Sequence, residues 1–160
     1  MKKIIALVFI IACILTACTD KKKESAVVYN DTVVKAVDRA DSVIQILFSF
    51  KMFEKFSEAQ NGYNTTFTKS LNQLNSLQPI VGDDTLRQTA IELIETYKNI
   101  VNEDFGGIYK IMNDSAYTVT DSLRVDSLMA EMYSKWQVQS SNMATEQNDF
   151  AKRHGIILEK

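Results

Sequence analysis

Proline and glycine are scarce in this 160-residue sequence, which contains one proline and five glycines. Both residues disfavour the interior of a helix, proline by about 3 kcal/mol and glycine by about 1 kcal/mol relative to alanine. Long stretches rich in Ala, Leu, Glu, Lys, Met and Gln, which are good helix formers, fill the space between them. The composition therefore predicts a helical chain.

Histidine occurs once, at position 154, and this limits the metal chemistry of a helical protein. A di-iron bundle needs Glu-x-x-His pairs, and Ala151 stands where the glutamate would be. Haem bound by His154 and a methionine is the alternative, but a lone histidine in a last helical turn is typical of contact with the helix dipole. Copper at Met129, Met132 and Met143 is a second alternative, although methionine at helical spacing usually fills a core. We expect no metal and no cofactor.

Signatures of catalysis are also missing. The sequence contains no Gly-x-Ser-x-Gly, no phosphate-binding loop and no paired His-Glu helix motif. Glu92 with Glu95, and Glu103 with Asp104, fit a solvated helix face better than an acid and base pair. The sequence therefore predicts a protein that is not an enzyme.

The N-terminus has the pattern of an export signal. Lys2 and Lys3 precede an apolar run at 4–15, which is shorter than the roughly 20 residues of a transmembrane helix. Leu15-Thr16-Ala17-Cys18 resembles the lipobox of bacterial lipoproteins, in which the cysteine thiol receives a diacylglyceryl group before cleavage ahead of it. An ordinary secretory signal with a chance cysteine is the alternative. The resemblance implies lipidation (palmitate-type acyl chains) at Cys18.

This interpretation divides the chain into three parts. Residues 1–17 form a cleaved signal peptide, residues 18–25 a lipid attachment site and polar tether, and residues 26–160 one helical domain. The mature chain has 16 basic and 20 acidic side chains, and this mild acidity argues against nucleic acid as a partner. Because Thr19, and not aspartate, follows the cysteine, the outer membrane is the expected location of the lipid anchor. We expect exposure at the cell surface, with the periplasmic face as the alternative.

Apolar residues recur at three- and four-residue steps through positions 26–160, the spacing that places side chains on one face of a helix. We expect helices over 26–59, 63–77 and 86–112, and a fourth from a cap at Thr118 or Thr120 to His154. Short connections make this an all-α, antiparallel up-and-down four-helix bundle with a short second helix. Residues 44–52 also alternate as in a strand, which is the competing interpretation.

Three details of these helices carry separate expectations. Gln60-Asn61-Gly62 is a turn signal between the first two helices. Asp83 or Asp84 is expected to cap the third helix, and Gly106-Gly107 to mark either a close helix approach or a bend within it. The apolar tail at 156–158 is expected to dock near Val27, Val28, Val33 and Val34 at the start of the first helix.

The mature chain resembles a family of small bacterial surface lipoproteins of unassigned function. Four groups of residues, in this order along the chain, carry the resemblance: Tyr29-Asn30-Asp31; Gly82-Asp83; Tyr97-Lys98 with Glu103; and Phe150-Ala151-Lys152 with His154-Gly155. The resemblance implies a surface-exposed helical domain and transfers no catalytic residue.

A short motif, Asp-Ser/Thr followed by an apolar residue, occurs six times. It resembles the O-glycosylation acceptor that one large phylum of Gram-negative bacteria uses on exported proteins. Asp-Ser and Asp-Thr are also natural helix openers, which alone explains the copies at Asp84 and Asp121. Ser115, in an expected loop, is the copy that we predict to be modified.

Two functions fit these observations. The first is a non-enzymatic interaction module at the cell surface, which binds a protein or envelope partner through a helix face. The alternative is a periplasm-facing bundle that holds a small apolar ligand in its core. Phe50 and Phe53 widen the apolar stripe of the first helix, and a stripe too wide for the core marks a partner site or a pocket wall. We prefer the surface module, with Phe50 and Phe53 as its candidate contacts.

The lipobox interpretation predicts that Cys18→Ala leaves a precursor that is soluble or uncleaved and no longer partitions with membranes. The measurement is detergent-phase partitioning together with the mass of the protein. Cys13→Ala is the matched control, because Cys13 lies within the signal and should leave processing unchanged. A Cys18→Ala protein found in the detergent phase at its mature mass would contradict the lipobox.

Overall fold

The computed structural model describes residues 2–49 and 53–158, with side chains from residue 22 onwards. Helices make up nearly all of this part of the chain, and no β-strand occurs in it apart from an isolated bridge between Ile80 and Asp83. The predicted all-α helical bundle is therefore confirmed. The elements, in chain order, are α1 (Lys2–Phe48), η1 (Phe53–Lys55), α2 (Phe56–Ser76), α3 (Thr85–Asn99), η2 (Ile100–Phe105), α4 (Gly106–Met112) and α5 (Val119–His154).

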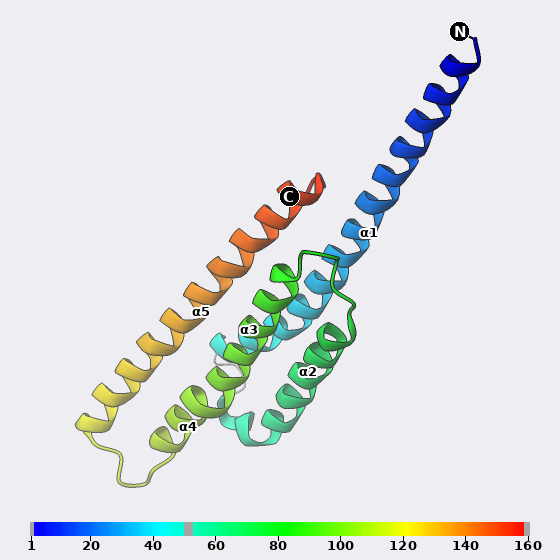
Figure 1. Ribbon diagram of the computed structural model, residues 1–160. Coiled ribbons are helices and arrows are strands. Elements are labelled where there is room, and N and C mark those ends of the chain that lie inside the picture. Colours follow the sequence, from blue (N-terminus) through cyan, green and yellow to red (C-terminus); the bar gives the residue numbers. More distant parts are fainter. Residues whose placement is uncertain (1, 50–52, 159–160) are drawn as a thin grey trace.

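α3, η2 and α4 follow one another without a break and form the central rod of the bundle. The rod contacts α1, α2 and α5, and in Figure 1 the chain reverses direction at each end of the rod. Its apolar stripe is buried as predicted, except for Met112, which is 45% exposed. The buried residues of the rod are Leu86, Ala90, Leu93, Ile94, Tyr97, Ile100, Val101, Phe105 and Ile108.

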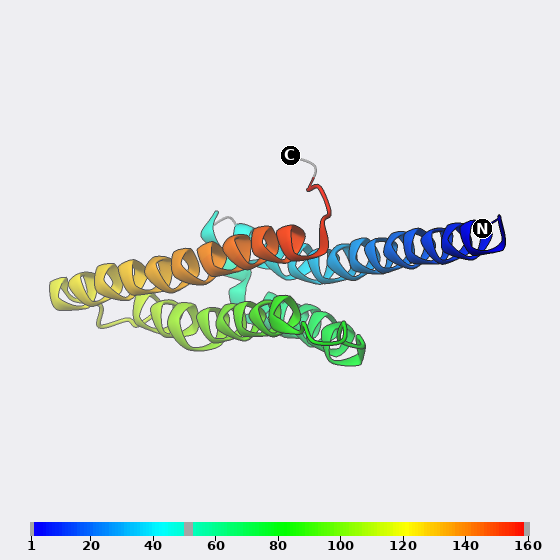
Figure 2. The same cartoon turned by 45° about the horizontal axis from the view of Figure 1, so that its top comes forward.

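α1 begins earlier than predicted and runs through the expected cleavage point and tether. Residues 18–25 are helical because extending a helix costs little once it is formed on one side. Ala26 is the first buried residue among the described side chains, and residues 22–25 are exposed. Figure 2 shows the N-terminal part of α1 extending beyond the rest of the molecule.

α1 also ends earlier than predicted, at Phe48, and the turn at Gln60-Asn61-Gly62 is wrong. These residues lie inside α2, and the chain reverses between α1 and α2 instead. The reason is a continuous stripe of buried side chains on α2, whose packing outweighs the cost of one exposed helical glycine. The strand alternative is also wrong for residues 44–48, which are helical, and residues 50–52 lie outside the described residues.

The two glycines of the rod do not mark a close helix approach. A Cβ atom at Gly107 would meet nothing within 4 Å, and one at Gly106 would meet only the Val101 carbonyl, at 3.6 Å. The irregularity lies just before them, in the π-helical segment η2. There the Asn102 side chain donates to the carbonyl of Lys98 at 2.8 Å. In a regular α-helix this carbonyl would instead accept from the backbone N–H of Asn102.

Asn102 also joins the rod to α2 through an uncharged amide cluster. Asn64 and Asn102 exchange two hydrogen bonds, each 2.9 Å long, and Gln60 donates to the same Asn102 oxygen at 3.0 Å. This cluster sets the position of α2 along the rod, because sliding either helix along the other would break all three hydrogen bonds.

Both ends of α5 were predicted correctly. Thr118 accepts from the Asp121 amide while the Asp121 side chain accepts from the Thr118 amide, which is a complete capping box. At the other end Gly155 has a φ of 63°, a left-handed conformation that glycine adopts without strain. Met132 and Met143 are buried and Met129 is partly buried, so these methionines fill the core as expected.

The tail after Gly155 folds back onto the start of the domain, as predicted. Ile156 is 8% exposed and belongs to the core, and Leu158 packs against it. Residues 156–158 line a shallow cavity together with Val27 and Val34 of α1. Ile157 differs from its neighbours, because it is 90% exposed.

The position of Gly62 inside α2 predicts that Gly62→Ala stabilises the protein. A Cβ atom there meets nothing within 4 Å, so the gain is the ordinary helix propensity of alanine, about 0.5–1 kcal/mol. Thermal or urea denaturation followed by circular dichroism measures it. Gly155→Ala is the contrast and should destabilise the protein, because φ there is positive. A destabilised Gly62→Ala protein would instead favour the turn.

Candidate functional site

Three segments that carry the family resemblance meet at one end of the bundle. Tyr29 comes from α1, Asp83 from the connection between α2 and α3, and His154 from the last turn of α5. Phe150 contacts both aromatic partners, with ring centroids 5.6 Å from Tyr29 and 4.4 Å from His154. We call the group the Asp83 cluster; it consists of Tyr29, Asp83, Asp84, Arg87, Glu146, Phe150, Arg153 and His154.

Asp83 joins the α2–α3 connection to the end of α5. Arg153 donates to its carboxylate from Nε at 2.8 Å and from Nη2 at 3.1 Å, and His154 Nε2 lies 2.9 Å from Oδ2. Burial would raise the pKa of Asp83, but the hydrogen bonds from Arg153 and His154 outweigh it and hold the pKa below its ordinary value. Arg153 also donates to Glu146 at 2.6 Å. The half-buried Asp83 carboxylate therefore stays ionised, and both of its oxygens have hydrogen-bond partners.

Asp84 links the start of α3 to α1. It is the N-cap residue of α3, but its side chain accepts no backbone amide there, because Arg87 and Gln88 donate to it at 2.6 and 2.9 Å. The Asp84 side chain is therefore not the cap, whereas Asp83, the other expected residue, receives a backbone hydrogen bond from Thr85 at the start of α3, which helps to lower its pKa. The hydrogen bond from Arg87 lowers the pKa of Asp84 to about 2. Tyr29 donates to the same carboxylate at 3.3 Å, and burial followed by the Asp84 charge raises the pKa of Tyr29 to about 12.

The Asp83 cluster holds helices together, and its charged side chains are paired with one another. Its carboxylates each face an arginine, and Tyr29 is held in its neutral form. The His154 nitrogen Nε2 is taken up by Asp83, so it is not free to bind a haem iron in this arrangement. Among the described side chains, no three histidine, cysteine or carboxylate groups lie close enough together to hold a metal ion.

A cavity of about 180 Å³ lies between α1, α3 and α5. Its polar side contains Tyr97, whose hydroxyl donates to Asp41 at 2.9 Å and lies 3.4 Å from Ser140 Oγ. Burial, partly offset by Ser140, raises the pKa of Tyr97 well above its ordinary value. The apolar side is formed by Val34, Val37, Leu93, Met143 and Ala144. An apolar ligand of the alternative function could lie in this cavity.

A second, polar groove of about 560 Å³ runs between the rod and α5. Lys135 stands at its edge and donates to Asp104 at 2.9 and 3.1 Å. The hydrogen bond to Asp104 raises the pKa of Lys135. The lysine is therefore committed to an ion pair that joins α5 to η2.

The structure describes only one of the two proposed contact residues, Phe50 and Phe53. Phe50 lies outside the described residues. Phe53 is partly buried in η1, and its ring centroid lies 5.8 Å from Phe105 and 5.3 Å from Tyr109 of the rod. The widened stripe therefore continues into a packed aromatic group, and a contact of Phe53 with a partner stays a prediction.

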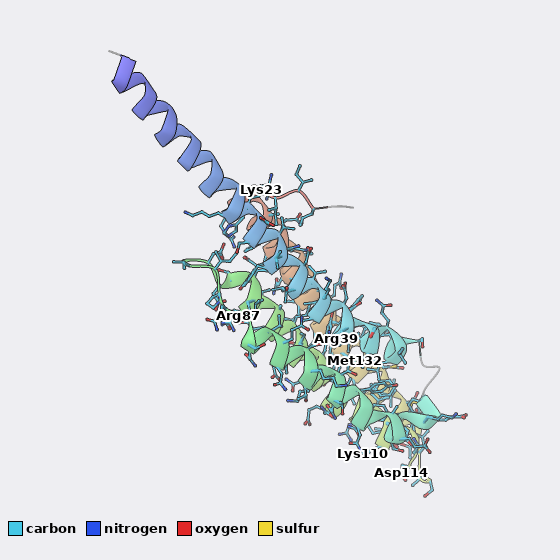
Figure 3. The ribbon with its side chains drawn as sticks, turned by 90° about the vertical axis from the view of Figure 1, so that its right-hand side faces the viewer. Lys23, Arg39, Arg87, Lys110, Asp114 and Met132 are labelled. Atoms are coloured by element: carbon cyan, nitrogen blue, oxygen red, sulfur yellow. The ribbon has the colours of Figure 1, made fainter. Side chains whose placement is uncertain are left out.

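The end of the bundle opposite the Asp83 cluster is the most open part of the described structure. Every residue from 112 to 120 is exposed, including Ser115 in the connection between α4 and α5. Figure 3 shows Asp114 of this connection at the far end from Lys23. Four exposed apolar side chains fall in or beside it: Met112 at 45%, Tyr117 at 44%, Val119 at 80% and Leu123 at 67%. We call residues 112–123 the α4–α5 tip.

The spacing of apolar residues in the sequence did not identify the apolar residues of the α4–α5 tip. Val119 and Leu123 lie off the stripe of Val125, Leu128 and Met132, which faces the core. An apolar residue that is off the stripe and next to a loop was the available signal. Spacing predicts which side chains share a face of a helix, whereas their exposure depends on which helices lie opposite that face.

Cys18 lies in the part of α1 whose side chains are not described. No helix in the described part of the chain is both long and apolar enough to cross a membrane. Comparisons with protein-family models, with curated proteins and with solved structures find no match to this chain.

The low pKa of Asp84 predicts a loss of stability in acid that depends on this residue. Its folded pKa of about 2 lies below the value of about 3.9 in an unfolded chain, so its contribution is present above about pH 4 and is lost toward pH 2. Allowing for solvent screening, Asp84→Asn should cost about 1–2 kcal/mol at pH 7 and almost nothing near pH 2. Urea unfolding at both pH values measures this difference.

Asp126→Asn is the matched control, because Asp126 is exposed and makes no salt bridge among the described residues. It should change stability little at either pH. If Asp84→Asn cost the same at pH 2 as at pH 7, the ionised carboxylate would not be the cause.

Proposed function

We propose that this protein is a lipid-anchored lipoprotein of the outer membrane. It is displayed at the cell surface and works without catalysis as an interaction module. The lipobox-like segment ending at Cys18 supports the anchor. The single observation that carries the interaction role is the α4–α5 tip, where exposed apolar side chains gather at the end of the bundle away from the anchor. Exposed apolar side chains that occur together are typical of protein interaction sites.

The tip is suited to reach a partner because of its position. The rod and α5 extend it away from the N-terminal part of α1, so a lipid on Cys18 holds the opposite end at the membrane (Figure 1). Tyr117 combines a large apolar surface with a hydroxyl, a residue type that is enriched at interfaces. The partner in this proposal is a protein that covers Tyr117, Val119 and Leu123.

Ser115 belongs to the same tip, and its modification is part of the proposal. It is exposed in the connection, where Tyr117 N–H donates to the Asp114 carbonyl and Ala116 N–H to the Asp114 side chain. The other Asp-Ser/Thr copies lie in or at the start of helices. An O-linked glycan on Ser115 would then stand beside the partner surface.

The alternative function, binding of a small apolar ligand, rests on the cavity beside Tyr97. Its volume of about 180 Å³ is smaller than the roughly 300–1,000 Å³ of most ligand sites. It suits a molecule about the size of benzene, which binds in a cavity of about 150 Å³ in another protein. This limits the alternative to very small ligands.

Chymotrypsin treatment of intact cells separates the two locations. Tyr117 is exposed in a connection, so we expect cleavage after it in molecules that have no partner bound, which gives a fragment that begins at Thr118. Tyr117→Ser should remove this cut and is the matched control. Cleavage that requires permeabilisation of the outer membrane would place the tip in the periplasm and contradict surface display.

Photo-crosslinking tests the partner surface itself. A photoreactive residue at Val119, which is 80% exposed, should give one discrete product of higher mass on intact cells. Leu123→Asp should abolish that product and leave the circular dichroism spectrum unchanged, because Leu123 is 67% exposed. The same residue at exposed Lys35 of α1 is the control position. No product at Val119, or equal products at both positions, would contradict a partner site at the tip.

A further inference from the structure

A second group of exposed apolar side chains lies at the opposite end of the bundle. Ile157 is 90% exposed, Val28 is 61% exposed and Val27 is 39% exposed. Ile157 and Val27 line the same cavity, and Val28 is the next residue of α1, about 100° further around the helix axis. We call these three residues the end patch.

The tail holds Ile157 in a defined place. Ile156 is buried in the core, and its amide donates to the Ala151 carbonyl at 3.0 Å, which closes the end of α5. Leu158, on the other side, packs partly against the core. With both neighbours fixed, the tail presents Ile157 outward at little further cost in conformational entropy.

The end patch lies close to the proposed lipid anchor along the chain. Cys18 precedes Val28 by ten residues, about 15 Å along a helix. The intervening residues 22–25 are helical and exposed, so their described side chains make no packing contact that holds this part of α1 away from the bilayer. A tilt of α1 on the lipid at Cys18 lets the end of the bundle approach the membrane.

The charged side chains around the end patch nearly cancel, so they favour neither acidic nor neutral lipids strongly. Lys22 and Lys23 are exposed, and the Lys152 side chain is 77% exposed. Glu24 and Asp31 are exposed nearby, and Asp149 pairs with Lys152 at 2.9 Å, so the two signs nearly balance. The attraction therefore has to come from the apolar side chains, which insert about 5–10 Å into the boundary between headgroups and acyl chains.

We propose that the end patch of Val27, Val28 and Ile157 is a membrane contact that inserts into the bilayer surface beside the lipid on Cys18. This inference rests on the lipid anchor of the proposed function. It assigns the C-terminal tail a role in setting how the bundle stands on the membrane, with the α4–α5 tip pointing away.

The sequence offers a clean way to test the contact. Cys13 and Cys18 are the two cysteines of the chain, the first is lost with the signal, and the second is taken up by lipid. Ile157→Cys in the lipidated mature protein therefore supplies one free thiol for an environment-sensitive fluorophore. The protein is reconstituted into phosphatidylcholine vesicles that carry nitroxide groups on their acyl chains.

A label at position 157 should lose several-fold more emission to the nitroxide lipids than a label introduced by Val119→Cys at the far tip. Val28→Asp should reduce the quenching at position 157, because a charge opposes insertion. Since Ile157 and Val28 are exposed, both variants should keep the wild-type circular dichroism spectrum.

The outcomes separate this inference from the anchor. A protein that does not float with the vesicles lacks the anchor, which overturns the proposed function and this inference with it. A protein that floats, but whose label at position 157 is quenched no more than the label at position 119, overturns the membrane contact alone. Quenching between two labelled copies in lipid without nitroxide would show that a second copy covers the patch, and would also overturn it.

Discussion

The central rod of α3, η2 and α4 has to bury three of its faces at once, because it lies between α1, α2 and α5. Its buried apolar side chains, from Leu86 to Ile108, belong to the one core that all the helices share. The π-helical segment helps it to do so, since Asn102 meets α2 while Asp104 meets Lys135 of α5. Both polar contacts bring their partners to fixed positions along the rod, and apolar packing fills the space between them.

Much of this arrangement could be predicted from the sequence, because local chemistry determines it. Thr118 and Gly155 bound α5 through a capping box and a left-handed glycine, both of which depend only on neighbouring residues. The reversal before α2 could not be found in this way. Gly62 carried a turn signal, but α2 continues through it because buried residues on both sides of Gly62 pack against other helices. This packing energy comes from tertiary contacts and outweighs the low helix propensity of glycine. Helix ends that are set by packing leave little local signal.

The candidate surfaces were harder to predict than the fold. Phe53 belongs to an apolar stripe by its spacing, yet it packs against Phe105 and Tyr109, which are distant in the sequence. Val119 and Leu123 have the same apolar character and stay exposed, because no described helix lies over them. Spacing predicts which side chains share a face, whereas exposure depends on what covers that face. Docking of the tail was predictable, because the apolar tail at 156–158 and the start of the first helix both lacked an expected packing partner and were expected at the same end of the bundle.

The polar contacts that position α2 and α5 differ in charge, so acid does not weaken all parts of the bundle equally. The cluster of Gln60, Asn64 and Asn102 is uncharged, so neither proton concentration nor salt changes its bonds. The Asp83 cluster depends on ionised carboxylates, which acid neutralises and salt screens. The Asp104–Lys135 ion pair between the rod and α5 depends on an ionised carboxylate in the same way. Acid therefore weakens the contacts of α5 at both places, and α2 keeps its position on the rod after α5 has loosened.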